Sequence, residues 1–263
     1  MVGGMDAFRR HFAGFTDSFV LIGGAACDEW FTRFGGRFRA TGDIDMVLVL
    51  EASPARFFPH FWKFIKAGGY EVGQRADGER TFYRFLKPAA PDHPKVIELF
   101  SAARLDADPF PGSKIIPIHS GEDASSLSAI LMDPDYYGFI MSQREMCNGL
   151  PLIKPAGLLA LKARAWLDLA HRRASGDATV KVDDVSKHRS DVFRLAAILP
   201  VGERLVLPVS ISADLHGFLE AFPAASPEWT AITQSLRNSG IRMTPAELLD
   251  ILRNCFAPDG VGH

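Results

Sequence analysis

An apolar run that opens with two aspartates is the feature that most constrains this chain. Residues 43–50 are Asp-Ile-Asp-Met-Val-Leu-Val-Leu, with no charge after Asp45. Such a run is typical of a buried strand, in which side chains alternate between the two faces. Asp43 and Asp45 therefore share one face, while Ile44 and Met46 point into the core on the other. The fold must bury this strand and still leave room for two carboxylates at its start.

The first half of the chain alternates between short apolar runs and helix-compatible segments. Residues 19–22 predict a strand and residues 25–34 a helix, with glycine pairs at the boundaries. Pro54 predicts the start of a helix with aromatic residues at spacings of three and four. Further strands are expected over residues 46–50, 70–74, 81–86 and 95–100. This order predicts an α+β fold, with an N-terminal mixed β-sheet and packed helices over residues 1–120.

The second half predicts mainly helices. Residues 155–173 form the longest amphipathic pattern, and shorter helices are expected over 191–199, 212–222 and 244–255. The last of these is announced by the start signal Thr-Pro-Ala-Glu. A polar stretch, Ser-Gly-Glu-Asp-Ala-Ser-Ser from residue 120, indicates a boundary. We therefore expect a mainly helical domain over residues 121–263.

Composition narrows the classes of protein. The 263 residues are 47% hydrophobic, and 29 basic against 31 acidic residues give a net charge of -2. This balance provides no overall basic field for gripping nucleic acid. The three cysteines are too few and too scattered for a disulfide framework or a zinc site. Without a long apolar segment, we expect a cytoplasmic protein with no membrane partner.

The paired aspartates suggest a metal site. Two carboxylates on one patch repel each other unless a cation lies between them. Magnesium is usually held by one or two carboxylates together with substrate phosphates. The simpler structural interpretation is that Asp43 and Asp45 are turn residues after Gly42, and on this pair alone that interpretation is favoured.

Two further features strengthen the metal hypothesis. Gly23 and Gly24 precede a predicted helix, where backbone N–H groups can approach phosphate oxygens. Glu98 is a lone carboxylate within the apolar strand Lys-Val-Ile-Glu-Leu-Phe, although an exposed strand position explains it equally well in isolation. Together, a glycine turn, paired aspartates and a third carboxylate form the layout that two-metal nucleotidyl transfer requires.

The segment LIGGAACDEWFTRFGGRFRATGDIDMVLV resembles the signature of the polymerase β-like nucleotidyltransferase superfamily. Arg39 and Thr41, just before the aspartate pair, are similar to the AbiEii/AbiGii toxin-like branch, as are LLALKARAWLDL and KHRSDVFRLAAIL. One departure is that Gly24 stands where many members have serine. The resemblance covers residues 19–50 and 154–199 well and Glu98 weakly.

The resemblance implies a catalytic site and a reaction. Asp43, Asp45 and Glu98 would be the catalytic metal ligands, with Mg2+ or Mn2+ as the cofactor and an NTP as the substrate. The nucleotide would be bound by the following residues: Gly23, Gly24, Thr41, Lys162 and Asp191. Glu98 would position a second metal or deprotonate the acceptor hydroxyl. The branch further implies an RNA acceptor and an antitoxin partner.

The helical residues allow simpler interpretations. Lys162 also suits a solvated helix face, and Asp191 also suits charge stabilisation at a helix N-terminus. Lys187 and Arg189, with Lys181 and His188, form a basic cluster that either is a solvated loop or steers an acceptor such as RNA.

Three functions from different classes remain. The first is a magnesium-dependent nucleotidyltransferase that acts on RNA or another hydroxyl acceptor. The second is a catalytically inactive module of the same fold that binds nucleotide or docks a partner. A remote third is nucleotide transfer to a small-molecule hydroxyl.

Overall fold

The computed structural model describes residues 2–49, 52, 54–77, 80–101, 115–117 and 133–256. The chain divides into two compact units. The first comprises Met1–Arg33, Phe38–Ser120 and Ile140–Ile153, and the second comprises Phe34–Arg37, Gly121–Phe139 and Lys154–His263. The polar stretch expected to mark the boundary lies largely outside the described residues.

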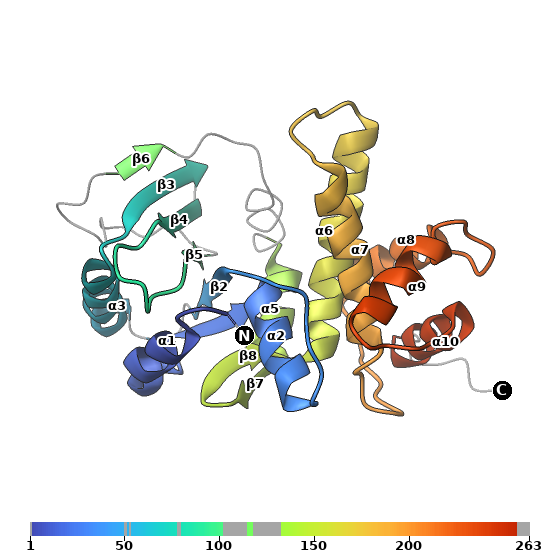
Figure 1. Cartoon of the computed structure of the whole chain (residues 1–263), viewed down its shortest axis with the longest axis horizontal. Helices are drawn as coiled ribbons and strands as arrows, with labels where there is room; N and C mark the ends of the chain where they lie inside the picture. Colours follow the sequence, from blue (N-terminus) through green and yellow to red (C-terminus); the bar gives the residue numbers. More distant parts are fainter. Residues whose placement is uncertain are drawn as a thin grey trace. The chain divides into compact units, whose positions relative to one another are not determined.

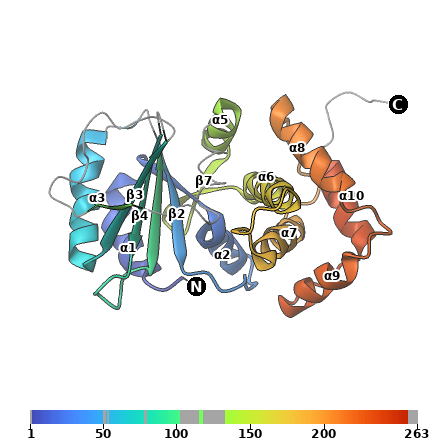
Figure 2. The same ribbon diagram turned by 90° about the horizontal axis from the view of Figure 1, so that it is seen from above.

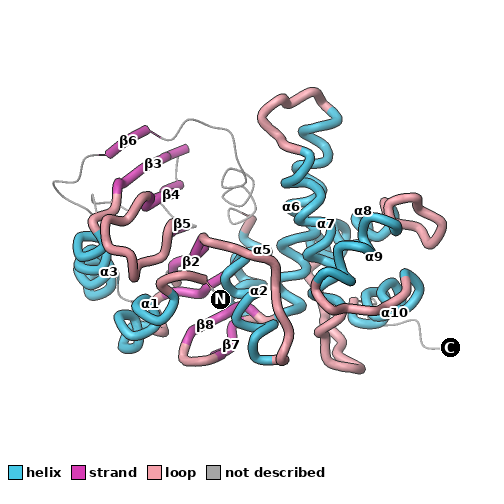
Figure 3. Tube along the Cα trace, viewed as in Figure 1, coloured by secondary structure: helices cyan, strands magenta, loops and turns pink. Residues whose placement is uncertain are grey.

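The first unit contains a mixed eight-stranded sheet (Figures 1 and 3). Its strands follow the order β6-β3-β4-β5-β2-β1-β8-β7. They are β1 (Phe19–Ile22), β2 (Asp43–Leu48), β3 (Glu71–Asp77), β4 (Arg80–Leu86), β5 (Val96–Ser101), β6 (Ile115–Pro117), β7 (Arg144–Cys147) and β8 (Leu150–Ile153). β2 pairs antiparallel with β1 and parallel with β5, so it is an interior strand with neighbours on both edges.

The hairpin β7–β8 changes the predicted division of the chain. Its turn is Asn148-Gly149, both with positive φ, the conformation that tight hairpin turns favour. β8 pairs parallel with β1, so Ile140–Ile153 belong to the first unit. A division at residue 120 assigned this hairpin to the helical domain instead.

Among the described residues, three helices of the first unit lie against the sheet. α1 (Met5–Phe12) and α3 (Pro54–Gly68) lie on one side of the strands, and α2 (Gly23–Arg33) lies on the other (Figure 2). A short 3-10 helix, η1 (Ala13–Phe15), follows α1. The α1/α3 side is held by aromatic packing, in which the Phe12 ring lies within about 6 Å, centroid to centroid, of its neighbours. Those neighbours are Phe8, Phe19, Phe57, Phe61 and Phe64.

The second unit is helical. It comprises α6 (Pro155–Ala174), α7 (Val182–Ala196), α8 (Val209–Glu220), α9 (Trp229–Asn238) and α10 (Pro245–Cys255). α5 (Pro134–Ser142) begins in this unit and ends in the first. α6 packs against α7 and α8 around a core of Phe193, Phe218 and Trp166. α10 starts with the predicted capping box, in which Thr244 and Glu247 satisfy each other's backbone N–H groups.

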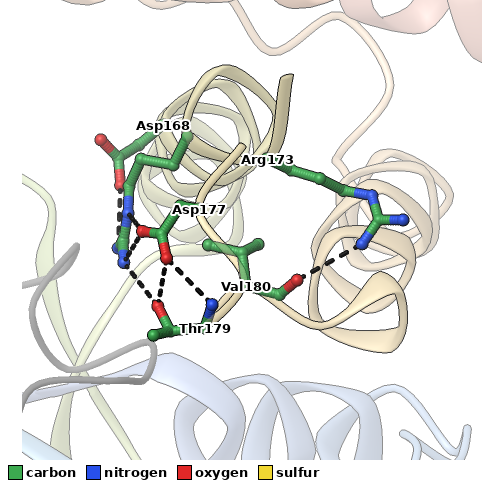
Figure 4. A network of polar contacts seen from close by, with 6 residues as sticks. Asp168, Arg173, Asp177, Thr179 and Val180 are labelled. Atoms are coloured by element: carbon green, nitrogen blue, oxygen red, sulfur yellow. Dashed lines mark hydrogen bonds and ion pairs between the residues drawn. The ribbon is translucent and has the colours of Figure 1, made fainter. Parts of the chain in front are cut away.

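A polar network closes the turn between α6 and α7 (Figure 4). Asp177 accepts hydrogen bonds from the Thr179 hydroxyl at 2.6 Å and the Thr179 backbone N–H at 2.9 Å. These bonds, together with Arg172 at 2.8 Å, lower the pKa of Asp177 to about 2. α7 begins five residues after Asp177, at Val182.

The early start of α7 corrects one sequence prediction, which placed a charged connection over residues 177–186 and the helix from Asp191. The charges do not break this helix, because Asp183 and Asp184 occupy its first turn, where the helix dipole favours carboxylates. The predicted α+β class is nevertheless confirmed. In the described part of the chain, no helix is both long and apolar enough to cross a membrane.

The aromatic cluster gives a stability prediction. Phe12→Ala removes a side chain that is 1% exposed and should cost about 3–5 kcal/mol of unfolding free energy, because the ring leaves a cavity. Urea unfolding followed by circular dichroism measures this cost. Phe34→Ala, at a side chain that is 52% exposed, is the matched control and should change stability by less than about 1 kcal/mol. Equal effects would show that the cluster does not support the sheet.

Candidate functional site

Asp43 and Asp45 lie on one face of β2, as the alternation predicts. Both are half-buried, whereas Ile44 and Met46 between and after them are fully buried. The site therefore sits on the sheet face opposite α1 and α3, since Phe19 and Met46 share the aromatic side. The two carboxylates are therefore partly exposed, while the strand that carries them is anchored in the core.

The turn from β1 into α2 packs closely against Asp45. Gly23 has φ +66°, and a Cβ atom at this position would lie 1.7 Å from Asp45 Oδ2. A Cβ atom on Gly24 would lie 2.5 Å from the Thr41 hydroxyl oxygen. The two glycines therefore let the first turn of α2 approach both side chains, and the structure brings Gly23, Gly24, Thr41 and Asp45 together. The backbone N–H groups at a helix start without side chains can also approach phosphate oxygens closely.

Glu98 on β5 lies on the same sheet face as Asp43 and Asp45, and these three residues form a row of carboxylates across β2 and β5. Parallel pairing sets Glu98 opposite Asp45, and the Glu98 residue is only 7% exposed. Burial raises the pKa of the Glu98 carboxyl well above its usual range, and the nearby Asp45 raises it further. Arg84 on β4 opposes this shift, with its Nε atom 3.0 Å from Glu98 Oε1.

The arrangement suits a divalent cation held by two carboxylates rather than an all-protein cage. Among the described residues, no group of three or more His, Cys, Asp or Glu side chains is arranged to hold a metal ion. Asp43 and Asp45 nevertheless provide the two oxygen ligands on one face that magnesium uses beside substrate phosphates. Because Gly23 has no side chain, the Asp45 carboxylate can lie directly against the first turn of α2.

Lys162 and Asp191 meet in the second unit, on α6 and α7. Lys162 Nζ lies 3.4 Å from Asp191 Oδ2, and Arg194 Nη1 lies 2.9 Å from Asp191 Oδ1. Asp191 is fully buried and Lys162 is 7% exposed, so a solvated helix face is the wrong interpretation of Lys162. Asp191 is the tenth residue of α7, counting from Val182, so it does not stabilise a helix N-terminus.

Lys187 and Arg189 lie on α7 rather than in a loop. Lys187 Nζ is 2.8 Å from Asp184 Oδ1, and Arg189 forms an ion pair with Glu228. Each cation is therefore matched by a carboxylate of the same unit. This pairing reduces the positive field that was expected to steer an acceptor.

Two cations of these networks, Arg84 and Arg194, were not predicted from the sequence. Arg84 is a lone charge in the strand Thr-Phe-Tyr-Arg-Phe-Leu, as Glu98 is in its own strand. Two single opposite charges in apolar strands are a signal that the strands pair. Arg194 follows Asp191 by three residues, a spacing that places both on one side of a helix.

Comparison with known proteins does not assign the chain to a family. No family model matches the chain, and no curated protein matches it. One solved structure with similarity is a crystal structure of an antigenic nucleotidyltransferase-like protein from Paracoccidioides brasiliensis, with 12% sequence identity and a TM-score of 0.42. The match covers 89% of this chain and 94% of that chain. Likeness at this level carries no argument about activity.

The glycine contact gives a second prediction. Gly23→Ala should destabilise the first unit by at least about 1 kcal/mol, because alanine is strained at positive φ and its Cβ would displace Asp45. Thermal unfolding measures the effect. Gly14→Ala is the control, since a Cβ atom there has no neighbour within 4 Å. A Gly23 variant as stable as the Gly14 variant would contradict the close approach.

The buried charge network gives a third prediction. Asp191→Ala leaves the buried Lys162 and Arg194 without their shared carboxylate, which should cost about 3–5 kcal/mol of unfolding free energy. Lys187→Ala breaks a more exposed pair and should cost no more than about 1 kcal/mol. Chemical unfolding of both variants tests the difference, and comparable costs would argue against a network at Asp191.

Proposed function

We propose that this protein is a magnesium-dependent nucleotidyltransferase that transfers a nucleotide from an NTP to a hydroxyl acceptor. The observation that supports this most is the juxtaposition on β1, β2 and β5. A glycine-only helix start lies against Asp45, and Glu98 lies directly opposite Asp45 on the neighbouring strand. Carboxylates beside a phosphate-compatible backbone suit the handling of a triphosphate with a divalent cation.

Asp43 and Asp45 would hold the cation. A divalent ion, Mg2+ or Mn2+, supplies positive charge that offsets the triphosphate and the pyrophosphate leaving group. The first turn of α2 at Gly23 and Gly24, with the Thr41 hydroxyl beside it, would contact phosphate oxygens through hydrogen-bond donors. These chain groups bind and orient the nucleotide for in-line attack.

In the transfer step, the acceptor hydroxyl oxygen forms a bond to the α-phosphorus as the bond to pyrophosphate breaks. The hydroxyl proton must leave at the same stage. Glu98 would either accept this proton or hold a second metal. Its raised pKa suits the first of these roles, because a general base works best when its pKa approaches the working pH.

Lys162 and Asp191 would serve the nucleotide as well. The Lys162 ammonium would offset triphosphate charge, and Asp191 would orient it, which is supported by the 3.4 Å contact between them. The resemblance extends the proposal to an RNA acceptor and an antitoxin partner. An inactive nucleotide-binding module is the second candidate, because Arg84 forms an ion pair with Glu98, the third carboxylate of the row.

Nucleotide binding tests the proposal. Calorimetry with each of the four NTPs should detect binding that requires Mg2+ and weakens at least about tenfold in the Asp43→Ala, Asp45→Ala double variant, which lacks both metal ligands. Asp17→Ala, at a side chain that is 97% exposed, is the control and should bind as the wild type does.

Transfer itself separates the two candidates. Radiolabelled NTP incubated with RNA should yield labelled RNA with the wild type and none with the double variant. Binding without transfer to RNA or to small hydroxyl acceptors would favour the inactive module. If no nucleotide binds with or without Mg2+, the proposed function is wrong.

The acceptor has its own test. If Lys187 and Arg189 contact RNA despite their acidic partners, replacing both with alanine should weaken RNA binding and reduce its dependence on salt while NTP binding stays unchanged. Filter binding over a range of salt concentrations measures this. An unchanged salt dependence would remove these two residues from the acceptor site.

A further inference from the structure

Two histidines join α1 to α3 through a reciprocal contact. His11 lies in the last turn of α1, and its Nε2 atom donates a hydrogen bond to the His60 backbone carbonyl at 3.0 Å. His60 on α3 returns the contact, because its Nε2 atom donates to the His11 carbonyl at 2.7 Å. The last carbonyls of a helix have no partner within that helix. Each imidazole therefore binds the backbone of the other helix.

The hydrogen bonds define where further protons bind. A carbonyl oxygen only accepts hydrogen bonds, so both Nε2 atoms carry hydrogen and each neutral ring keeps Nδ1 for an added proton. The two rings are stacked, with their centroids 4.0 Å apart and their planes 25° apart. Two imidazolium rings at this separation repel each other, so a second proton binds less readily than the first.

The surroundings of His60 suit one positive charge. The Phe15 ring stacks on the His60 ring at 4.2 Å, centroid to centroid. The face of an aromatic ring attracts a cation. His60 also contacts the C-terminal end of α1, where the helix dipole favours positive charge. The first proton is therefore expected on His60.

The surroundings of His11 disfavour a charge. His60 and Lys63 face it from α3, and His93 faces it from the segment between β4 and β5. Burial lowers the pKa of His11; the hydrogen bond to the His60 carbonyl opposes this shift, and the neighbouring cations lower the pKa further. The Asp92 carboxylate of this region is bound by His93 Nδ1 at 3.0 Å. The folded state therefore favours a neutral His11 more than the unfolded chain does.

We propose that His11 and His60 form an acid-sensitive latch between α1 and α3. The closed latch holds at most one proton beyond its neutral state, on His60. Once α1 has left α3, both rings take up a proton below about pH 6. A proton that binds only to the open state weakens the closed state as the pH falls.

The latch controls one cover of the sheet. α1 and α3 lie together on the side of the strands that carries the aromatic cluster (Figure 2). Release of α1 would therefore expose the Phe12 cluster to water at acidic pH. This inference stands apart from the proposed function, because it uses no residue of the carboxylate row.

Amide hydrogen exchange of the full chain tests the latch. Protection factors, which correct for the intrinsic effect of pH on exchange, should fall at least about tenfold in α1 from pH 7 to pH 5, because one extra proton shifts the opening equilibrium up to tenfold per pH unit. His11→Gln keeps a donor for the His60 carbonyl but takes up no proton, so the fall should shrink to less than about threefold. His171→Gln, at an exposed position of α6, is the control and should show the wild-type fall.

Nitrogen-15 NMR of the histidine rings counts the protons in the closed pair. At pH 7 both His11 and His60 should carry hydrogen on Nε2. At pH 5 the His60 ring should be charged and the His11 ring neutral in the folded chain.

Two results would overturn the latch. The first is two charged rings at pH 5 with the protection of α1 unchanged. The second is an equal fall in protection in the wild type and in His11→Gln. If circular dichroism shows that His11→Gln is not folded at pH 7, His60→Gln replaces it, because that change also removes the repulsion between the rings, and the NMR titration requires only the wild type.

Discussion

The site depends on the backbone pairing of β2 along its two edges. Antiparallel pairing with β1 sets Ile22 opposite Asp45, so the chain turns at Gly23 directly beside the carboxylate. Parallel pairing with β5 sets Glu98 on the other side. A slip of one residue along either edge would move these side chains to opposite faces. The register is anchored by the fully buried side chains of Ile44 and Met46, which would also be displaced by such a slip.

The parts of the fold that follow from local periodicity could be predicted from the sequence. The period of two residues in a strand fixes the common face of Asp43 and Asp45 without any knowledge of neighbouring strands. The pairing of Arg84 with Glu98 is of a different kind, because it depends on which strands lie side by side. Single opposite charges in two apolar strands suggest a partner but do not identify it among several strands.

Other differences between the predicted and the observed elements arose where a local sequence pattern was misleading. The hairpin at Asn148-Gly149 carries a strong turn signal, yet its strands are only four residues each and lie between helical segments. The charged segment before Asp191 favoured a loop, although its acidic residues suit the start of α7. The buried pair of Lys162 and Asp191 is joined by Arg194, which also reaches Ser235 on α9, a partner far along the chain.

The contact between Gly23 and Asp45 ties two positions of the chain to one another. Positive φ alone would admit asparagine at position 23 at modest strain, since asparagine tolerates the left-handed region better than most residues. The Asp45 carboxylate removes even that option, because any Cβ atom would collide with it. If Asp45 were replaced by a smaller residue, only the positive φ would still restrict position 23, and asparagine would become acceptable there. The carboxylate and the backbone conformation therefore restrict position 23 independently of each other.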